Sequence, residues 1–459
     1  MKYAQLDKLW DSLRSSFWFV PTLMVGLSIA LSFFTIGIDH RLEADAINHV
    51  SWAYALGPSG SRAVLSAIAG SMVSVATTAF SITIVALQLA SSQFGPRLLR
   101  NFMQDTGNQV VLGTFISTFV YSLMVLRTVN EVEGREFVPH VAVTCALGLA
   151  IASIGVLIYF LHHAASSIQV DHIITAVGHD LEEAIDRLFP TPFGQGQPDL
   201  TPATAVVERL ADFEHSAHRV KAKTSGYIQV IDEHQLMAIA TEHDLIIQVR
   251  QQPGRFVVQG CDLMRILPAE SIDSSLEAQI DQTLVIGSKR TNQQELEFSI
   301  TQLVEIAVRA LSPGINDPFT AIRCIDQLSA TLAQLAQQQM PWPYRYDEQN
   351  QLRVLTPPIA FGDITDAAFN QIRQNGRSSV AVTLRLLEAI AVIAPFTQQE
   401  ADRAALRRHA QMIERGSQEA IYEPLDRQDI QTQYVATMAA IEPVEAKLNP
   451  KPGLAVSSP

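Results

Sequence analysis

The residues best suited to chemistry in this chain form a polar stripe within its second apolar segment. Hydroxyl and amide side chains recur there at intervals of three and four residues, interrupted only at Val85, which puts them on one helix face. They are Ser71, Ser74, Thr78, Ser81, Gln88 and Ser92. Lipid tails form no hydrogen bonds, so such a face lines a water-filled path or packs against another helix.

Small residues overlap this stripe and favour the packing alternative. Ser66, Gly70, Ser74 and Thr78 follow one another at four-residue spacing, which allows two membrane helices to approach closely. The two interpretations stay open, because in an oligomer a single face can both pack and line a path.

Two basic residues follow the stripe. Pro96 suits the first turn of a new helix, in which Arg97 and Arg100 would share one face. At a membrane surface they could bind lipid phosphates. Around the mouth of a pore they could instead concentrate anions.

A compact loop in the second half of the chain is the other candidate site. Two prolines, a glycine, an asparagine and an aspartate within Ser312–Pro318 predict a tight corner between two helices, with Asp317 as helix cap. The loop is either a plain corner or a ligand or contact site. The candidate residues are Ser312, Gly314, Asn316, Asp317 and Arg323.

Catalytic and metal-binding patterns are not evident, and we expect no enzyme, cofactor or metal. The sequence has no phosphate-binding loop ending in Gly-Lys-Ser/Thr and no Gly-x-Ser-x-Gly elbow. His215 and His218 have helical spacing beside Asp212 and Glu214, but no second ligand pair completes a site. The histidines after the fourth apolar segment are expected to face water: His162, His163, His172 and His179.

The stripe lies in the second of four stretches that contain no charged side chain. Each is long enough for a bilayer span, which needs about 20 apolar residues. We predict a domain over residues 1–170 with four transmembrane helices at about 15–38, 66–90, 108–127 and 139–162. We expect no buried Asp, Glu, Lys or Arg within the spans, which disfavours a proton-coupled pump.

The charge distribution divides the chain and indicates its orientation. The first 170 residues contain nine basic and nine acidic side chains, so the residues beyond Val170 carry the whole net charge of −13. This acidity argues against nucleic acid as a partner. Lys2, Lys8 and Arg14 favour a multi-pass protein of the cell inner membrane with both termini in the cytoplasm. The three cysteines form no spaced pair, as suits a reducing compartment.

Beyond the spans we predict a soluble α+β domain. Its parts are a juxtamembrane helix and linker (171–202), a β-rich segment resembling a small barrel of the biotinyl-carrier type (203–270), a helical region (271–442) and a disordered tail (443–459). Residues 236–240, 245–249 and 255–258 are predicted strands. The turn at Ala240–Asp244 has no Lys to modify, so a carrier role is not expected. A helix is predicted over 291–311, with Thr291 and Gln294 as a capping box.

Three long motifs resemble one known family. "FSITIVALQLASSQFGPRLLRNFMQD" (80–105), "SGYIQVID" (225–232) and "RALSPGINDPFTA" (309–321) are similar to those of bacterial predicted membrane proteins catalogued as domain of unknown function 2254. The resemblance extends from the spans to about Leu387. Where the family often has Arg-Thr-x-x-Gln-Asp, this chain has Glu295 at the last position. The resemblance implies an integral membrane protein with a cytosolic domain and assigns no activity.

The sequence therefore supports two hypotheses on the function of the protein. The first is a homo-oligomeric ion channel or passive permeation pathway, gated or assembled by the acidic cytosolic domain. Its motivation is the polar stripe with Arg97 and Arg100 near its end. The alternative is a non-transporting membrane scaffold or sensor whose cytosolic domain binds a partner. In both, the expected surroundings are the lipid bilayer and further copies of the chain.

Overall fold

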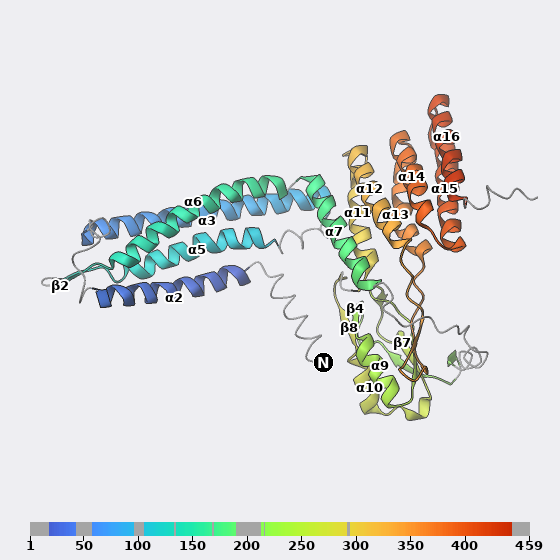
Figure 1. Cartoon of the computed structure of the whole chain (residues 1–459), viewed down its shortest axis with the longest axis horizontal. Coiled ribbons are helices and arrows are strands. Elements are labelled where there is room, and N and C mark those ends of the chain that lie inside the picture. Colours follow the sequence, from blue (N-terminus) through green and yellow to red (C-terminus); the bar gives the residue numbers. More distant parts are fainter. Residues whose placement is uncertain are drawn as a thin grey trace, which may run out of the picture. The chain divides into compact units, whose positions relative to one another are not determined.

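The structure is a computed structural model that describes residues 18–42, 57–95, 105–132, 135–167, 169–189, 213–214, 216–291 and 294–442. The chain divides into two compact units, Met1–Ile173 and Ile174–Pro459. Among the described residues, the first unit has four long helices and a short hairpin, and the second combines helices with two sheets (Figure 1). The predicted linker and C-terminal tail lie outside the described residues.

The four helices of the first unit are long and apolar enough to cross a membrane. They confirm the prediction of four N-terminal apolar helices. Their bounds are α2 (Phe19–Leu42), α3 (Pro58–Phe94), α5 (Thr106–Leu126) and α6 (His140–Ser167). Strands β1 (Asn130–Val132) and β2 (Arg135–Phe137) form an antiparallel hairpin between α5 and α6.

Helix α5 is the centre of this unit, because it packs most extensively against the other three helices, α2, α3 and α6. Its span is 44% buried, against 22% or less for the other three. Phe115 and Tyr121 are completely buried in the core around it. By contrast, large apolar side chains such as Phe33, Phe80 and Ile151 are exposed on the outer faces. In water such a surface would be costly, whereas lipid accommodates it.

A buried carboxylate joins two of these helices. Asp39 lies in the last turns of α2 and is only 7% exposed, although we expected the first span to end before it. Its Oδ1 accepts the backbone N–H of Val141 (2.8 Å) and its Oδ2 that of Ala142 (2.9 Å). Asp39 therefore caps the N-terminus of α6 from a different helix and satisfies amide groups that α6 cannot pair itself.

The second unit begins within helix α7 (Val170–Leu188). Its apolar positions recur at helical spacing in the sequence, and the structure buries that face, including Ile174, Val177, Leu181 and Ile185. Within this unit α7 runs beside α12 (Pro318–Leu335): the Gln327 side chain fills the space that a Cβ at Gly178 would need. Farther along, Gln334 Nε2 donates to Asp186 Oδ1 (3.3 Å).

Eight strands form two open sheets in this unit. The larger sheet has the order β3-β7-β5-β10-β9, the smaller has the order β6-β4-β8, and no barrel closes among the described strands. The strands are β3 (His218–Lys221), β4 (Gly226–Ile231), β5 (Ile246–Val249), β6 (Phe256–Val257), β7 (Asp262–Leu267), β8 (Leu284–Gly287), β9 (Tyr344–Tyr346) and β10 (Leu352–Leu355). Helices α9 (Glu233–Glu242) and α10 (Ser274–Asp281) and the short η2 (Ala269–Ser271) accompany them.

The strand predicted over 236–240 is wrong, because these residues belong to helix α9. Asp232 precedes the helix, and its side chain accepts the backbone N–H of Gln235 (3.0 Å), as an N-cap does. Five consecutive apolar residues carry no period of two or of 3.6, so only the cap in front of them distinguishes the two structures.

Antiparallel helices complete the second unit. They are α11 (Leu296–Ala310), α12, α13 (Phe361–Gly376), α14 (Val380–Ile393), η3 (Ala394–Phe396), α15 (Glu400–Ala420) and α16 (Pro424–Ile441). Short turns join α11 to α12, α13 to α14 and α15 to α16. These turns lie at the end of the helices away from the sheets (Figure 1). The coarse prediction of a mixed helical and sheet domain after the spans is confirmed.

The Asp39 cap generates a stability prediction. Asp39→Ala leaves two N–H groups of α6 without their acceptors, which costs about 1–3 kcal/mol for a buried site. We expect a lower Tm for the detergent-solubilised protein, with Asp39→Asn, which keeps one carbonyl oxygen, between it and the unsubstituted protein. Asp363→Ala, at an exposed carboxylate, is the control. Equal Tm values for Asp39→Ala and Asp363→Ala would contradict the cap.

Candidate functional site

The predicted polar stripe lies on the outer face of α3. Its six residues are all exposed: Ser71, Ser74, Thr78, Ser81, Gln88 and Ser92. The opposite face packs on the other helices through Leu65, Met72, Ala79 and Ala90. The stripe therefore does not serve packing inside one chain. Either lipid or another molecule covers it.

The hydroxyl groups of the stripe are satisfied within their own helix. Each donates to a carbonyl oxygen three or four residues earlier, at 2.8 to 3.1 Å. Such bonds let Ser and Thr tolerate lipid, so the hydroxyls alone do not require a partner. The Gln88 side-chain amide differs, because it has no hydrogen-bond partner among the described residues.

The stripe spans two depths of the unit. Thr83 of α3 and Asn108 of α5 line one small hollow, and α5 begins only two residues before Asn108. The last turns of α3, about nine residues or 14 Å of helix, therefore extend past the start of α5. Ser71, Ser74, Thr78 and Ser81 lie at the level of α5 on the opposite face of α3, whereas Gln88 and Ser92 lie beyond that level. Arg97 and Arg100 lie outside the described residues.

The end of the unit where α5 begins contains a contact between a carboxylate and a histidine ring. Asp105 accepts the backbone N–H of Gly107 through Oδ1 (2.8 Å) and contacts His163 Nε2 of α6 through Oδ2 (2.5 Å). Tyr159 stacks on the His163 ring at 5.3 Å. His163, expected to face water, is therefore only 23% exposed. A hollow of about 490 Å³ between α5 and α6 adjoins the pair, with Gly107 and Tyr159 among its lining residues.

Sequence reasoning missed a polar line in the interior of the first unit. Ser28, Ser32, Thr35 and Asp39 are buried along one face of α2. The Thr35 hydroxyl shares a hydrogen bond with the Tyr121 hydroxyl (2.8 Å), which also donates to the Ala142 carbonyl (3.2 Å). Their spacing of four, three and four residues is the signal that could have revealed them.

The corner between α11 and α12 is tightly held. Asp317 Oδ1 accepts the backbone N–H groups of Phe319 (3.1 Å) and Thr320 (3.2 Å), and Oδ2 accepts the Thr320 hydroxyl (2.6 Å). The hydrogen bond from that hydroxyl, together with the two N–H groups, lowers the pKa of Asp317 from its usual value. Asn316 takes a left-handed φ of 53°, and its N–H donates to the Ser312 carbonyl (2.8 Å).

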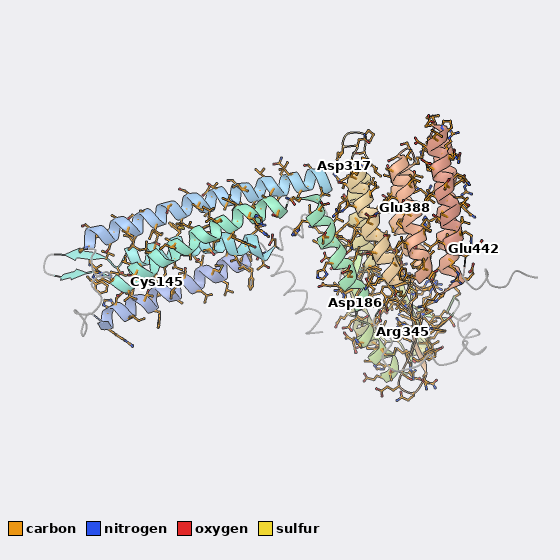
Figure 2. The ribbon with its side chains drawn as sticks, turned by 45° about the horizontal axis from the view of Figure 1, so that its top comes forward. Cys145, Asp186, Asp317, Arg345, Glu388 and Glu442 are labelled. Carbon is orange, nitrogen blue, oxygen red and sulfur yellow. The ribbon has the colours of Figure 1, made fainter. Side chains whose placement is uncertain are left out.

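The other candidate residues of the corner do not converge on a pocket. Gly314 is exposed, and no atom lies within 4 Å of where its Cβ would be. Arg323 is exposed one and a half turns into α12. Figure 2 shows Asp317 at the end of the helices away from Arg345, which belongs to the larger sheet. The corner is therefore a rigid projecting feature.

A second motif of the chain fastens the small sheet. Gln294 brackets the backbone of Ile231 at the end of β4: its Oε1 accepts the Ile231 N–H (2.8 Å) and its Nε2 donates to the Ile231 carbonyl (3.0 Å). Arg290 Nε donates to Oε2 of the buried Glu295 (3.1 Å). The Glu295 carboxylate fills the space where Gly254, at φ +86°, would carry a Cβ. We call these four contacts the β4 clasp.

The clasp also explains an error in the predicted helix. We expected the helix to begin at Thr291 with Gln294 in a capping box, but α11 begins at Leu296. Gln294 is held by Ile231 and Glu295 by Arg290, so neither is available to an earlier turn.

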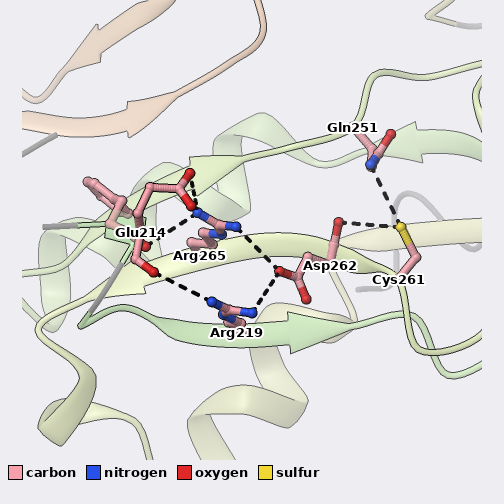
Figure 3. Close-up of polar contacts among 7 residues, drawn as sticks. Glu214, Arg219, Gln251, Cys261, Asp262 and Arg265 are labelled. Carbon is pink, nitrogen blue, oxygen red and sulfur yellow. Dashed lines mark hydrogen bonds and ion pairs between the residues drawn. The ribbon is translucent and has the colours of Figure 1, made fainter. Parts of the chain in front are cut away.

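Ion pairs occupy the residues near the predicted histidine pair. Glu214 contacts Arg265 Nη1 (2.6 Å), and this ion pair lowers the pKa of Glu214 (Figure 3). His218 Nε2 contacts Glu277 (2.9 Å), while Asp212 and His215 lie outside the described residues. Within the described ranges, no three His, Cys, Asp or Glu side chains gather as a metal site.

The β4 clasp generates a second stability prediction. Gly254 and Gly260 both have φ near +87°, but only Gly254 has a side chain in the place of its missing Cβ. Gly260→Ala should cost only the backbone strain, about 1–2 kcal/mol. Gly254→Ala should cost more, because Glu295 must also leave Arg290. Thermal unfolding of the full chain measures both, and a Gly260→Ala change as large as that of Gly254→Ala would overturn the clasp.

Comparison with known proteins agrees with the architecture. The family of predicted membrane proteins named DUF2254 matches residues 14–392. Uncharacterized proteins of Mycobacterium bovis and Mycobacterium tuberculosis are 32% identical over 425 residues, which cover 91% of this chain and 79% of theirs. No solved structure matches the chain. With most of its length matched, from before the first span into the helical region, the chain belongs to the predicted membrane protein family DUF2254.

Proposed function

We propose that the chain forms a homo-oligomeric pathway for passive permeation across the bacterial inner membrane, in which the outer face of α3 meets other copies of the chain. One observation carries the proposal. The polar stripe and the row of small residues lie on the same face of α3, and that face points away from α2, α5 and α6.

The chemistry of this face suits contact between subunits. Gly70 has no atom within 4 Å of its missing Cβ, so a second helix can approach the backbone there. Ser74 and Ser81 continue the face with small hydroxyl side chains. Small residues on a surface directed at lipid contribute little, whereas between helices they permit close packing.

The same face suits a conduit rather than a pump. Its polar groups are hydroxyls and one amide, and the stripe contains no ionisable side chain that could relay protons. Hydroxyl groups that bond their own backbone still offer lone pairs to water or to an ion. Copies of α3 around a symmetry axis would present Ser71, Ser74, Thr78 and Ser81 to such a path.

The proposal includes the orientation and the role of the second unit. Both termini lie in the cytoplasm, supported by Lys2, Lys8 and Arg14 before the first span and Arg97 and Arg100 between the second and third. The second unit then assembles or gates the oligomer from the cytoplasmic side. Its negative charge supports solubility beside an anionic membrane.

A pair of glycines provides the matched test of assembly. Gly70 on α3 and Gly148 on α6 both lie on outer faces, with open space at the missing Cβ. We expect Gly70→Leu to dissociate the oligomer, because Leu holds the neighbouring helix away, and Gly148→Leu to leave it intact. Native mass spectrometry of the detergent-solubilised protein measures the number of subunits. A monomer in the unsubstituted protein, or identical behaviour of both variants, would overturn the assembly.

Flux measurements on the same samples test permeation. In liposomes we expect ion or small-solute flux that Ser81→Leu reduces and Ser81→Thr retains. Thr114→Leu, which removes a hydroxyl from α5, is the control. A stable oligomer without flux would refute the pathway and favour the scaffold alternative. Flux unchanged by Ser81→Leu would remove α3 from the path.

A further inference from the structure

The corner between α11 and α12 presents two large apolar side chains to the surroundings. Phe319 is 77% exposed in the first turn of α12, and Ile315 is 50% exposed in the turn before it. Adjacent exposed apolar side chains are a candidate surface for interaction with a partner or a membrane. The contacts of Asp317 and Asn316 fix the backbone, so little conformational entropy is lost when the corner binds.

The contacts between α12 and α7 show at which level of α7 the corner lies. Gln327 contacts Gly178, and Gln334 contacts Asp186, so α12 and α7 run in the same direction within the second unit. Counting four residues back along both helices places Arg323 level with Ile174. Phe319 lies one turn farther toward the free end of α12.

Few residues separate this level of α7 from the fourth candidate span. The fourth candidate span ends at Ser166, eight residues before Ile174. Eight residues reach no more than about 28 Å when fully extended, and part of this segment is already helical in α7. The covalent link therefore limits how far Ile174, and the helix α12 that packs beside α7, can lie from the end of the fourth candidate span.

Two basic side chains near the corner suit an anionic lipid surface, although Glu423 is also exposed at this end of the helices, in the turn between α15 and α16. Arg323 is exposed beside Phe319, and Arg377, in the neighbouring turn between α13 and α14, is exposed as well. The carboxylate of Asp317 is engaged by the α12 N-terminus. Basic side chains near a bilayer bind anionic head groups, and aromatic side chains partition into the interface.

We propose that Ile315 and Phe319 insert into the lipid interface of the membrane that the same chain spans, with Arg323 at the head groups. The SPGINDP corner is then a membrane-docking element of the second unit. It holds the helical region against the bilayer surface. This inference does not depend on permeation or on the number of subunits.

A tryptophan introduced at the corner tests the proposal in the full chain. Phe319→Trp is compared with Phe396→Trp, at a 40% exposed phenylalanine in η3 at the opposite end of the helices. Both are reconstituted in vesicles of phosphatidylglycerol and brominated phosphatidylcholine, whose bromine atoms quench nearby indoles. Subtracting the spectrum of the unsubstituted protein removes the four native tryptophans.

We expect the difference spectrum of the Phe319→Trp variant to be shifted to shorter wavelength and strongly quenched by the brominated lipid, with neither effect for the Phe396→Trp variant. Adding Arg323→Glu to Phe319→Trp should weaken the quenching. Equal and weak quenching at both positions would overturn the proposal. A blue shift for Phe319→Trp without quenching would also overturn it, because a protein surface rather than lipid would then cover the corner.

Discussion

A bilayer core contains no hydrogen-bond donor or acceptor, so the polar groups of the first unit that lie within it must find their partners within protein. The interior meets this constraint by pairing helices. Asp39 of α2 accepts two amide groups of α6, and Tyr121 of α5 lies between Thr35 and the Ala142 carbonyl. These contacts tie three helices together at one level. The outer face of α3 meets the constraint differently, since its hydroxyls bond their own backbone.

The long motifs of the second unit have a structural explanation in the described contacts. The β4 clasp fixes the end of β4 to the segment before α11, and Glu295 fills the space beside Gly254. The Glu295 carboxylate also reaches Arg290. The SPGINDP motif similarly builds one rigid corner. The two motifs therefore fix the backbone of the β4 clasp and of the SPGINDP corner. The exposed residues that these motifs hold in place are the candidates for a functional role.

The sequence predicted the structure correctly wherever one physical signal dominated. Long charge-free segments predicted the four spans, and the helical period of Ile174, Val177 and Leu181 predicted α7. The sequence did not predict the structure correctly where contacts between distant residues determine which secondary structure forms. The apolar run at 236–240 has no period of its own, and the start of α11 depends on Ile231, sixty-three residues away from Gln294. Ser28, Ser32 and Thr35 have the same spacing as the α3 stripe, yet one face is buried and the other exposed.

The unequal lengths of the helices separate the stripe into two environments. Helix α3 has 37 residues and α5 has 21, so the central helix accounts for the thickness of a bilayer core and α3 exceeds it. Ser71 to Ser81 lie at the level of α5, on the face of α3 that points away from it, whereas Gln88 and Ser92 lie past the start of α5. The hydroxyls at the level of α5 are bonded to their own helix, as suits a helix face directed at lipid. In the proposed permeation path, the Gln88 amide would therefore come first and the hydroxyls would follow, with the contact of Asp105 and His163 beside the start of α5.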